Sequence, residues 1–149
     1  MTCSNEVQVR HLEHLFDLEL QYRQELNPVT SPEGKIGQYI GSGDGTVNGP
    51  KIQGTIRWDL YEDIGERVCQ TNFVGIIDTD DSARIQFETK GFGMVPDPSK
   101  PNDWVMSYAV RFDTGDSRYE WLNNALALLD GEFSTETYVH HYRAFIGIR

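Results

Sequence analysis

The chain is poor in positive charge and in cysteine. Its 149 residues carry 13 Lys and Arg against 23 Asp and Glu, which gives a net charge of −10. Nucleic-acid phosphates and anionic lipid repel such a chain, so we expect neither nucleic acid nor membrane as a partner. Two cysteines, Cys3 and Cys69, are too few for a zinc site built from thiolates, and a disulfide between them is not the favoured interpretation.

Long apolar runs are also missing. No segment approaches the roughly 20 apolar residues that cross a bilayer, and the beginning, MTCSNEVQVRHLEHLF, lacks the apolar stretch of a signal peptide. We therefore expect a cytoplasmic protein. With 7 Phe, 7 Tyr and 3 Trp, the chain is too rich in core-forming residues to be a disordered acidic chain. The length fits a single domain, residues 1–149, in which we expect residues 1–10 to be frayed.

Short alternating apolar stretches recur between clusters of Gly, Pro, Asn and Asp, whereas helical periodicity is scarce. The clearest stretch runs over residues 51–61, where Ile52, Ile56, Trp58 and Leu60 alternate with polar residues. About eight such stretches predict an all-β domain, either a closed antiparallel β-barrel or a β-sandwich. We favour the barrel because closure removes exposed edges, and a barrel of ~8 strands has room for side chains or one small ligand.

Further elements are predicted from the same patterns. Residues 36–40 predict a short second strand, followed by a glycine-rich turn or bulge over 41–50. Residues 91–103 carry three prolines and predict a long loop, residues 121–129 fit either a strand or a helix, and residues 138–148 predict a last strand with either face inward. A first strand is predicted with one face formed by Leu12, His14, Phe16, Leu18, Leu20 and Tyr22.

Two patterns of residues stand at fixed spacings. The first is a glycine pair followed by Gly-Pro and a further Gly, and the second reads Phe-x-Thr-Gly and then Tyr-x-Trp-Leu-Asn. Their residues here are Gly41, Gly43, Gly49, Pro50 and Gly54, then Phe112, Thr114, Gly115, Tyr119, Trp121, Leu122 and Asn123. From about Leu15 to Ile148 the chain resembles the bacterial and fungal domain-of-unknown-function family 3237. The resemblance implies an antiparallel β-barrel in a family whose chemistry is mostly unassigned.

The chain departs from that family at two places. Family members usually carry Ala-Asp-Trp after the glycine that matches Gly54, whereas this chain reads RWDLYEDIG, with Trp58 before Asp59. An Arg typical of the fourth strand is replaced near Asn72. If the family residues perform a shared reaction, this chain does something different with the same barrel.

Asp59 is the first candidate for chemistry. It follows Trp58 in the most regular alternating strand, on a polar face that is either solvated or turned toward a ligand. A carboxylate enclosed by aromatic side chains has its pKa raised by desolvation, which suits a general acid or base near neutral pH. We expect His140 or Tyr108 as its partner, and Asn72 as a hydrogen-bond donor to a substrate carbonyl or enolate.

Tyr119, Trp121 and Asn123 alternate, so in an extended segment they face the same way. Their apolar area and polar tips suit either a pocket wall or a plug at a corner of the barrel. We expect no metal site, because the adjacent His140 and His141 point to opposite faces of a strand and cannot line one site together.

The sequence therefore predicts a small cofactor-independent enzyme, of isomerase, cyclase, lyase or hydratase type, acting on a hydrophobic or aromatic metabolite. No nucleotide fingerprint, thiolate cluster or Ser-His-Asp signature is visible, which leaves acid–base chemistry and enclosure as its means. One alternative is a non-catalytic carrier or sensor of a lipophilic molecule, and another is an assembly subunit with a filled interior. Apolar strand faces predict a homodimer or homotrimer. The expected catalytic residues are Asp59, His140 and Tyr108, and the expected substrate-binding residues are Trp58, Asn72, Tyr119, Trp121 and Asn123.

Overall fold

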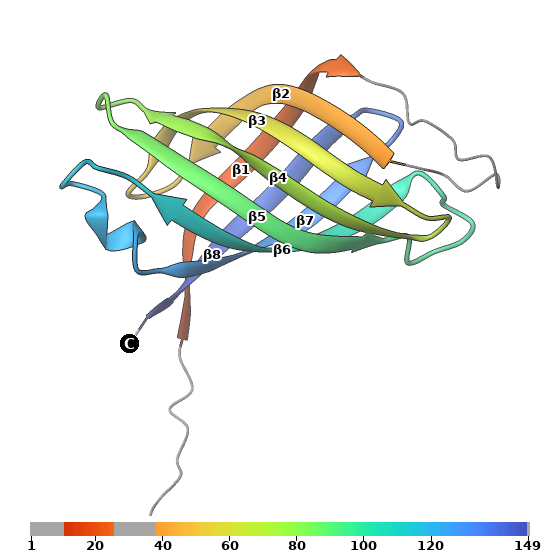
Figure 1. Cartoon of the computed structure of the whole chain (residues 1–149). Helices are drawn as coiled ribbons and strands as arrows, with labels where there is room; N and C mark the ends of the chain where they lie inside the picture. The colour runs from red at the N-terminus through yellow and green to blue at the C-terminus, as the bar shows by residue number, and fades with distance from the viewer. Residues whose placement is uncertain (1–10, 26–37, 149) are drawn as a thin grey trace, which may run out of the picture.

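The computed structural model describes residues 11–25 and 38–148, and in these ranges eight antiparallel strands close into one barrel (Figure 1). Each strand pairs with the next along the chain, and β8 pairs with β1. The predicted barrel is confirmed over the sandwich. The strands are β1 (His11–Glu25), β2 (Gln38–Asn48), β3 (Gln53–Ile64), β4 (Val68–Thr79), β5 (Arg84–Met94), β6 (Asp103–Asp113), β7 (Leu126–Ser134) and β8 (Val139–Ile148).

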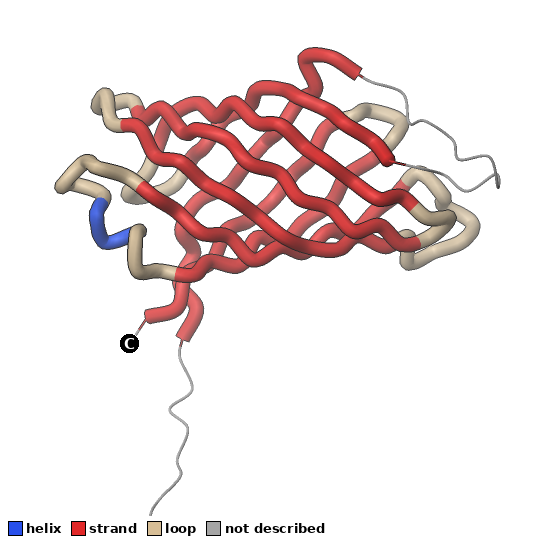
Figure 2. The backbone as a smooth tube through the Cα atoms, in the orientation of Figure 1, coloured by secondary structure: helices blue, strands red, loops and turns tan. Residues whose placement is uncertain are grey.

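The two ends of the barrel differ in their connections. The 3-10 turn η1 (Glu120–Leu122) precedes β7 and lies at the end that also carries the β2–β3 and β4–β5 connections (Figure 2). We call this the η1 end. The connections 65–67, 95–102 and 135–138 lie at the opposite end, which we call the far end. In the described ranges, no helix is long and apolar enough to span a membrane.

β3 turns its apolar face into the barrel. Ile56, Trp58, Leu60 and Glu62 are buried, and the residues between them are exposed. Because successive side chains of a strand point to opposite faces, burying the apolar face turns the intervening polar residues outward. The strand begins at Gln53 and ends at Ile64, whereas residues 51–61 were predicted, and its last buried position is the carboxylic acid Glu62.

β1 departs from the predicted alternation at its beginning. Its pairing with β8 shifts register between His14 and Phe16, and Leu15 and Phe16 are both buried. Leu12 is 57% exposed. The prediction that Leu12 and His14 share the inward face with Phe16 is therefore wrong, because a β-bulge adds one residue and reverses the alternation before it.

Residues 41–48 of the glycine-rich stretch belong to a strand, and only residues 49–50 lie in a connection. β2 runs through Asn48, so the predicted strand end at residue 40 is wrong; residues 36–37 of that prediction lie outside the described ranges. A Cβ added at Gly43 would lie 2.5 Å from the Trp58 ring and would overlap the backbone oxygen of Gln21. Glycine stands here because the indole and the neighbouring strand leave no space for a side chain.

Other predicted boundaries also move. β5 continues through Met94 and β6 begins at Asp103, so the connection spans 95–102 rather than 91–103. The ambiguous segment 121–129 contains the end of η1 and the beginning of β7. Cys69 is a buried free thiol, whereas Cys3 and the expected fraying of residues 1–10 lie outside the described ranges.

Candidate functional site

The half of the lumen toward η1 is a packed apolar core. The hollow among its side chains measures about 10 Å³, at the lower limit of the space that holds one water molecule. The residues around this hollow are apolar apart from one threonine: Phe16, Leu18, Ile56, Phe73, Ile77, Phe87, Thr89, Val110, Phe112 and Leu129. This half therefore supports the barrel, and a reactive site has to be sought in the other half.

The half of the lumen toward the far end carries polar and aromatic side chains instead. They come from seven of the eight strands and are buried, except for Tyr22 and Phe133, which are partly buried. We call this set the polar lumen: Tyr22, Tyr39, Trp58, Glu62, Cys69, Thr71, Tyr108, Phe133, His140 and Tyr142.

Four of these side chains form a chain of hydrogen bonds across the lumen. The His140 Nδ1 atom lies 2.5 Å from the Tyr142 hydroxyl, and its Nε2 atom lies 3.2 Å from the Tyr22 hydroxyl. The Tyr142 hydroxyl lies 3.3 Å from that of Tyr108. We call Tyr22, His140, Tyr142 and Tyr108 the Tyr–His chain, which joins β1, β8 and β6.

His140 is held as a neutral imidazole. Its side chain stacks on the Phe133 ring at a centroid distance of 4.1 Å and meets the Trp58 indole edge-on at 5.9 Å. Burial, with a smaller effect of the charge on His141, lowers the pKa of His140 to about 3. At neutral pH one ring nitrogen of His140 therefore donates a hydrogen bond and the other accepts one.

Glu62 is the carboxylic acid of the polar lumen. It is 7% exposed and lies between Tyr39 on β2 and Thr71 on β4 in the strand register. The Thr71 hydroxyl donates a hydrogen bond of 2.9 Å to Glu62 Oε1. Burial raises the pKa of Glu62 to about 7, although the bond from Thr71 lowers it in part. Near neutral pH, Glu62 is thus able both to donate and to accept a proton.

The remaining groups of the site stay uncharged near neutral pH. Burial, together with the nearby Glu62 carboxylate, raises the pKa of the Cys69 thiol to about 12. Burial likewise raises the pKa of Tyr22, Tyr108 and Tyr142 above the usual range of a phenol. Every Lys and Arg in the described ranges is exposed, so the polar lumen holds no described cation.

The structure brings together three of the residues that the sequence singles out. Trp58, Tyr108 and His140 all belong to the polar lumen. Asp59 and Asn72 lie on the outer faces of β3 and β4, where both are exposed. Their side chains point away from the lumen because the apolar faces of these strands turn inward.

Glu62 is the functional candidate that the sequence interpretation missed. Extending the alternation of Ile56, Trp58 and Leu60 by two residues would have placed Glu62 on the apolar face of the strand. A carboxyl group on such a face indicates a candidate functional group with a hydrogen-bond partner, because burying it without a partner is costly. Its partner Thr71 is identified only by the pairing of β3 with β4.

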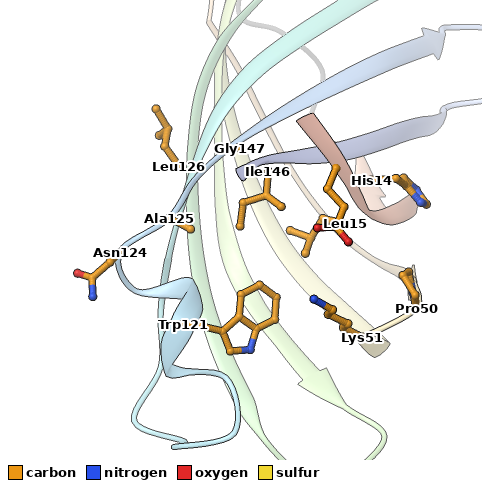
Figure 3. A pocket seen from close by; sticks show the side chains of 11 residues that line it. His14, Leu15, Pro50, Lys51, Trp121, Asn124, Ala125, Leu126, Ile146 and Gly147 are labelled. Atoms are coloured by element: carbon orange, nitrogen blue, oxygen red, sulfur yellow. The ribbon is translucent and has the colours of Figure 1, made fainter. Parts of the chain in front are cut away.

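The other three expected binding residues lie at the η1 end. Trp121 is 39% exposed and lines a surface hollow of about 430 Å³, where Lys51 Nζ stands 5.6 Å from the centre of its ring (Figure 3). The Tyr119 hydroxyl donates to the Asp81 carboxylate at 2.7 Å. Asn123 forms two hydrogen bonds with the backbone of Thr114, of 2.8 and 2.9 Å. Through these hydrogen bonds, Tyr119 and Asn123 stabilise the connections at the η1 end.

We expect Asn123→Ala to lower the free energy of unfolding by about 1–2 kcal/mol, because two partly buried backbone groups of Thr114 lose their partner. Urea denaturation measures the change. Asn124→Ala, at the exposed neighbouring position, is the matched control and should change little. Equal stability of the two variants would contradict the role of Asn123 in holding this end.

The described ranges contain no group of three His, Cys, Asp or Glu side chains placed to hold a metal ion. Fold and site together define a small antiparallel β-barrel with an apolar core at one end and a polar, aromatic lumen at the other. The chain belongs to the family described as "Protein of unknown function (DUF3237)", which matches residues 10–146. A comparison with curated proteins finds no match.

Solved structures share the barrel at low sequence identity. A β-barrel-like protein from Acinetobacter baumannii is 19% identical with a TM-score of 0.79, covering 97% of this chain and 100% of that one. A protein of unknown function from Clostridium acetobutylicum is 15% identical with a TM-score of 0.81, covering 96% and 100%. A protein described as an enzyme from Penicillium herquei is 20% identical with a TM-score of 0.62, covering 95% and 98%. At these sequence identities, the likeness shows a shared fold only.

Proposed function

We propose that the protein is a cofactor-independent enzyme that moves protons on an uncharged aromatic or hydrophobic metabolite in the polar lumen. Its reaction is of isomerase, cyclase, lyase or hydratase type. The observation that carries the proposal is Glu62, a buried carboxyl group with a pKa of about 7 that faces a hydrogen-bonded chain of tyrosines and histidine. Likeness to a barrel described as an enzyme agrees with this function.

Glu62 serves as the acid or base of the reaction. As the carboxylate it removes a proton from carbon or oxygen of the substrate, and as the acid it returns one. A pKa near the working pH keeps both forms populated. In this proposal Glu62 takes the part that the sequence suggested for Asp59, whose side chain is exposed on the outer face of β3.

The Tyr–His chain stabilises negative charge that develops on a substrate oxygen. Tyr22 is the partly buried end of this chain, so its hydroxyl is the donor that a ligand at the far end would meet first. Hydrogen-bond donors fixed in a water-poor site stabilise such charge strongly. Trp58 and Phe133, which flank His140, supply flat apolar walls for an aromatic ring.

The charges of the protein favour an uncharged substrate. The chain has a net charge of −10, which repels anions before they reach the barrel. Inside, a carboxylate ligand would find Glu62 rather than a cation, since every described Lys and Arg is exposed. Phosphorylated and carboxylated metabolites are therefore disfavoured.

A carrier of an aromatic molecule is the second candidate function. The aromatic enclosure of His140 by Phe133, Trp58 and Tyr22 favours it, because such rings bind a ligand without any proton transfer. The two functions differ in whether ionisation of Glu62 changes the bound molecule.

We also propose that the barrel self-associates through its outer surface. Met94 on β5 pairs with Val68 on β4 on one side and with Val105 on β6 on the other. These three side chains are 39–57% exposed, and Phe92, two residues from Met94, is 63% exposed. Neighbouring exposed apolar side chains are typical of a contact between subunits.

Base-catalysed ring opening of 5-nitrobenzisoxazole tests the enzymatic proposal without knowledge of the natural substrate. A base removes the proton on carbon while the N–O bond breaks, and the product is a coloured cyanophenolate. We expect the rate to rise as the pH passes through about 7, where Glu62 becomes a carboxylate. Glu62→Gln should lower kcat/KM by about 10²-fold or more, because the general base is removed.

Asp63→Asn is the matched control, since Asp63 is the exposed neighbour of Glu62 on the same strand. Its activity should equal that of the wild type. Binding of the compound without turnover above the buffer rate would contradict the enzyme and support the carrier. Loss of activity in Asp59→Asn but not in Glu62→Gln would contradict the assignment of the base to Glu62.

A further inference from the structure

Thr71 stands where the acid and the Tyr–His chain meet. It is 1% exposed and lies directly opposite Glu62 in the β3–β4 register. Its hydroxyl donates to Glu62 Oε1 at 2.9 Å. Burial raises the pKa of Tyr108, and hydrogen bonds with Tyr142 and with Thr71 lower it in part. A hydroxyl has one hydrogen and two lone pairs, so Thr71 is able to donate to Glu62 while accepting from Tyr108.

In the strand register Thr71 pairs with Gly91 on β5, which in turn pairs with Tyr108 on β6, so only a glycine stands between them. With Tyr108 bonded to Thr71, a continuous path of hydrogen bonds leads from Glu62 to Tyr22. Beyond Thr71 the path passes through Tyr108, Tyr142 and the two nitrogens of His140. Each hydroxyl between Glu62 and Tyr22 donates one hydrogen bond along the path and accepts one. The direction in which all hydrogens point is then fixed by the group at the end of the path, because each donor determines the next.

The charge state of Glu62 sets that direction. A Glu62 carboxylate only accepts, so Thr71 donates to it, Tyr108 donates to Thr71, and Tyr142 donates to Tyr108. His140 then carries its hydrogen on Nδ1 and accepts from Tyr22 at Nε2. A protonated Glu62 donates to Thr71 instead, which reverses every bond and places the hydrogen of His140 on Nε2.

We propose that Thr71 couples Glu62 to the Tyr–His chain, so that loss of the Glu62 proton switches the tautomer of His140 and delivers one proton at Tyr22. The balance is that of a proton relay. The Glu62 proton passes to Thr71, each group passes on its own hydrogen, and Tyr22 gives one proton to the ligand, with no change of oxidation state. Glu62 regains its proton from another atom of the ligand.

This relay rests on the proposed function and adds a second position for proton transfer to it. A substrate lying between Glu62 and Tyr22 loses a proton at one atom and gains one at another, which is the requirement of an isomerisation. Thr71 acts as a positioning residue, because it touches the acid and the chain rather than the ligand.

The other titratable groups around Glu62 do not change charge near neutral pH, so the switch can be observed without a second titration. Near neutral pH the Cys69 thiol stays protonated, with a pKa of about 12, and His140 stays neutral, with a pKa of about 3. Glu62, with a pKa of about 7, is the group that titrates in this range. The titratable side chains that face it are Tyr39 on β2, Cys69 on β4, Tyr22 on β1, Tyr108 on β6 and Tyr142 on β8.

Nuclear magnetic resonance of protein labelled with ¹⁵N-histidine tests the coupling without a ligand. As the pH rises through about 7, we expect the His140 Nδ1 resonance to move from the unprotonated to the protonated position, and Nε2 to move in the opposite sense. Thr71→Val should abolish the exchange and leave a single tautomer, while Glu62 still titrates in ¹³C spectra. Thr71→Ser keeps the hydroxyl and should restore the exchange.

Thr89→Val controls for the loss of another buried hydroxyl. Thr89 is 3% exposed and accepts a hydrogen bond from the Phe73 backbone rather than contacting Glu62, so the switch should persist. A wild-type His140 that keeps one tautomer while Glu62 titrates would overturn the coupling, as would an unchanged switch in Thr71→Val. If the switch is present but 5-nitrobenzisoxazole is not opened, the coupling stands and the proposed function fails.

Discussion

Replacing His140 with Gln is expected to abolish an acid-induced loss of about 5 kcal/mol in the free energy of unfolding. Burial lowers the pKa of His140 from 6.5 to about 3. Between these values the unfolded chain binds a proton on this residue and the folded chain does not. The contribution to stability is therefore complete above about pH 6.5 and is lost as the pH falls toward about 3.

Urea denaturation at a series of pH values measures the effect as a difference between the two proteins. His140→Gln starts from a lower stability, because stacking on Phe133 and hydrogen bonds to Tyr22 and Tyr142 are altered. The test is the slope against pH and not the absolute value, since all other titrating groups are common to both proteins. Parallel curves for wild type and variant below about pH 6.5 would show that His140 is not a buried neutral imidazole.

Replacing Glu62 with Gln is expected to have the opposite pH dependence, with a relative gain of about 3 kcal/mol as the pH rises from about 4.5 to above 7. Burial raises the pKa of Glu62 from 4.5 to about 7. In this range the folded wild type keeps a proton that the unfolded chain releases. The stability that protonated Glu62 contributes is therefore complete below about pH 4.5 and is lost as the pH rises through about 7, whereas Gln stays neutral.

Asp63→Asn serves as the control for Glu62→Gln, because Asp63 is exposed on the same strand and should show the wild-type slope. In wild type, the effects of Glu62 and His140 have opposite signs between about pH 4.5 and 6.5 and nearly cancel. Each single variant should therefore reveal the slope of the other group, about 1.4 kcal/mol per pH unit. A Glu62→Gln protein with the same slope as wild type would contradict burial of a protonatable carboxyl group.

The alternation of apolar and polar residues in the sequence was sufficient to predict the strands and part of the site. The period of two places His140, Tyr142 and Ala144 on one face, and places Trp58 beside Leu60, whatever the fold around them. Strands of this kind, separated by turn residues, favoured a closed barrel, which the structure confirms. Family membership was also visible in the sequence, through motifs that extend over most of the chain.

Pattern alone misled where packing overrides local preference. Glycine favours turns, yet Gly43 lies within β2. A glycine stands in this strand because the Trp58 ring occupies the space that a side chain would need. The bulge between His14 and Phe16 likewise reverses which residues of β1 face inward. No glycine or proline in this segment indicates a bulge.

The sequence by itself determined that this protein folds into strands with one apolar face and, apart from the beginning of β1, which side chains a strand presents together. Only the tertiary structure decided which face turns inward, and therefore that Glu62 rather than Asp59 is enclosed. It also decided that Tyr22 meets His140, 118 residues away, through the pairing of β1 with β8 that closes the barrel. Contacts between distant strands depend on register, and register follows from burying all eight faces at once, which no local stretch of sequence specifies.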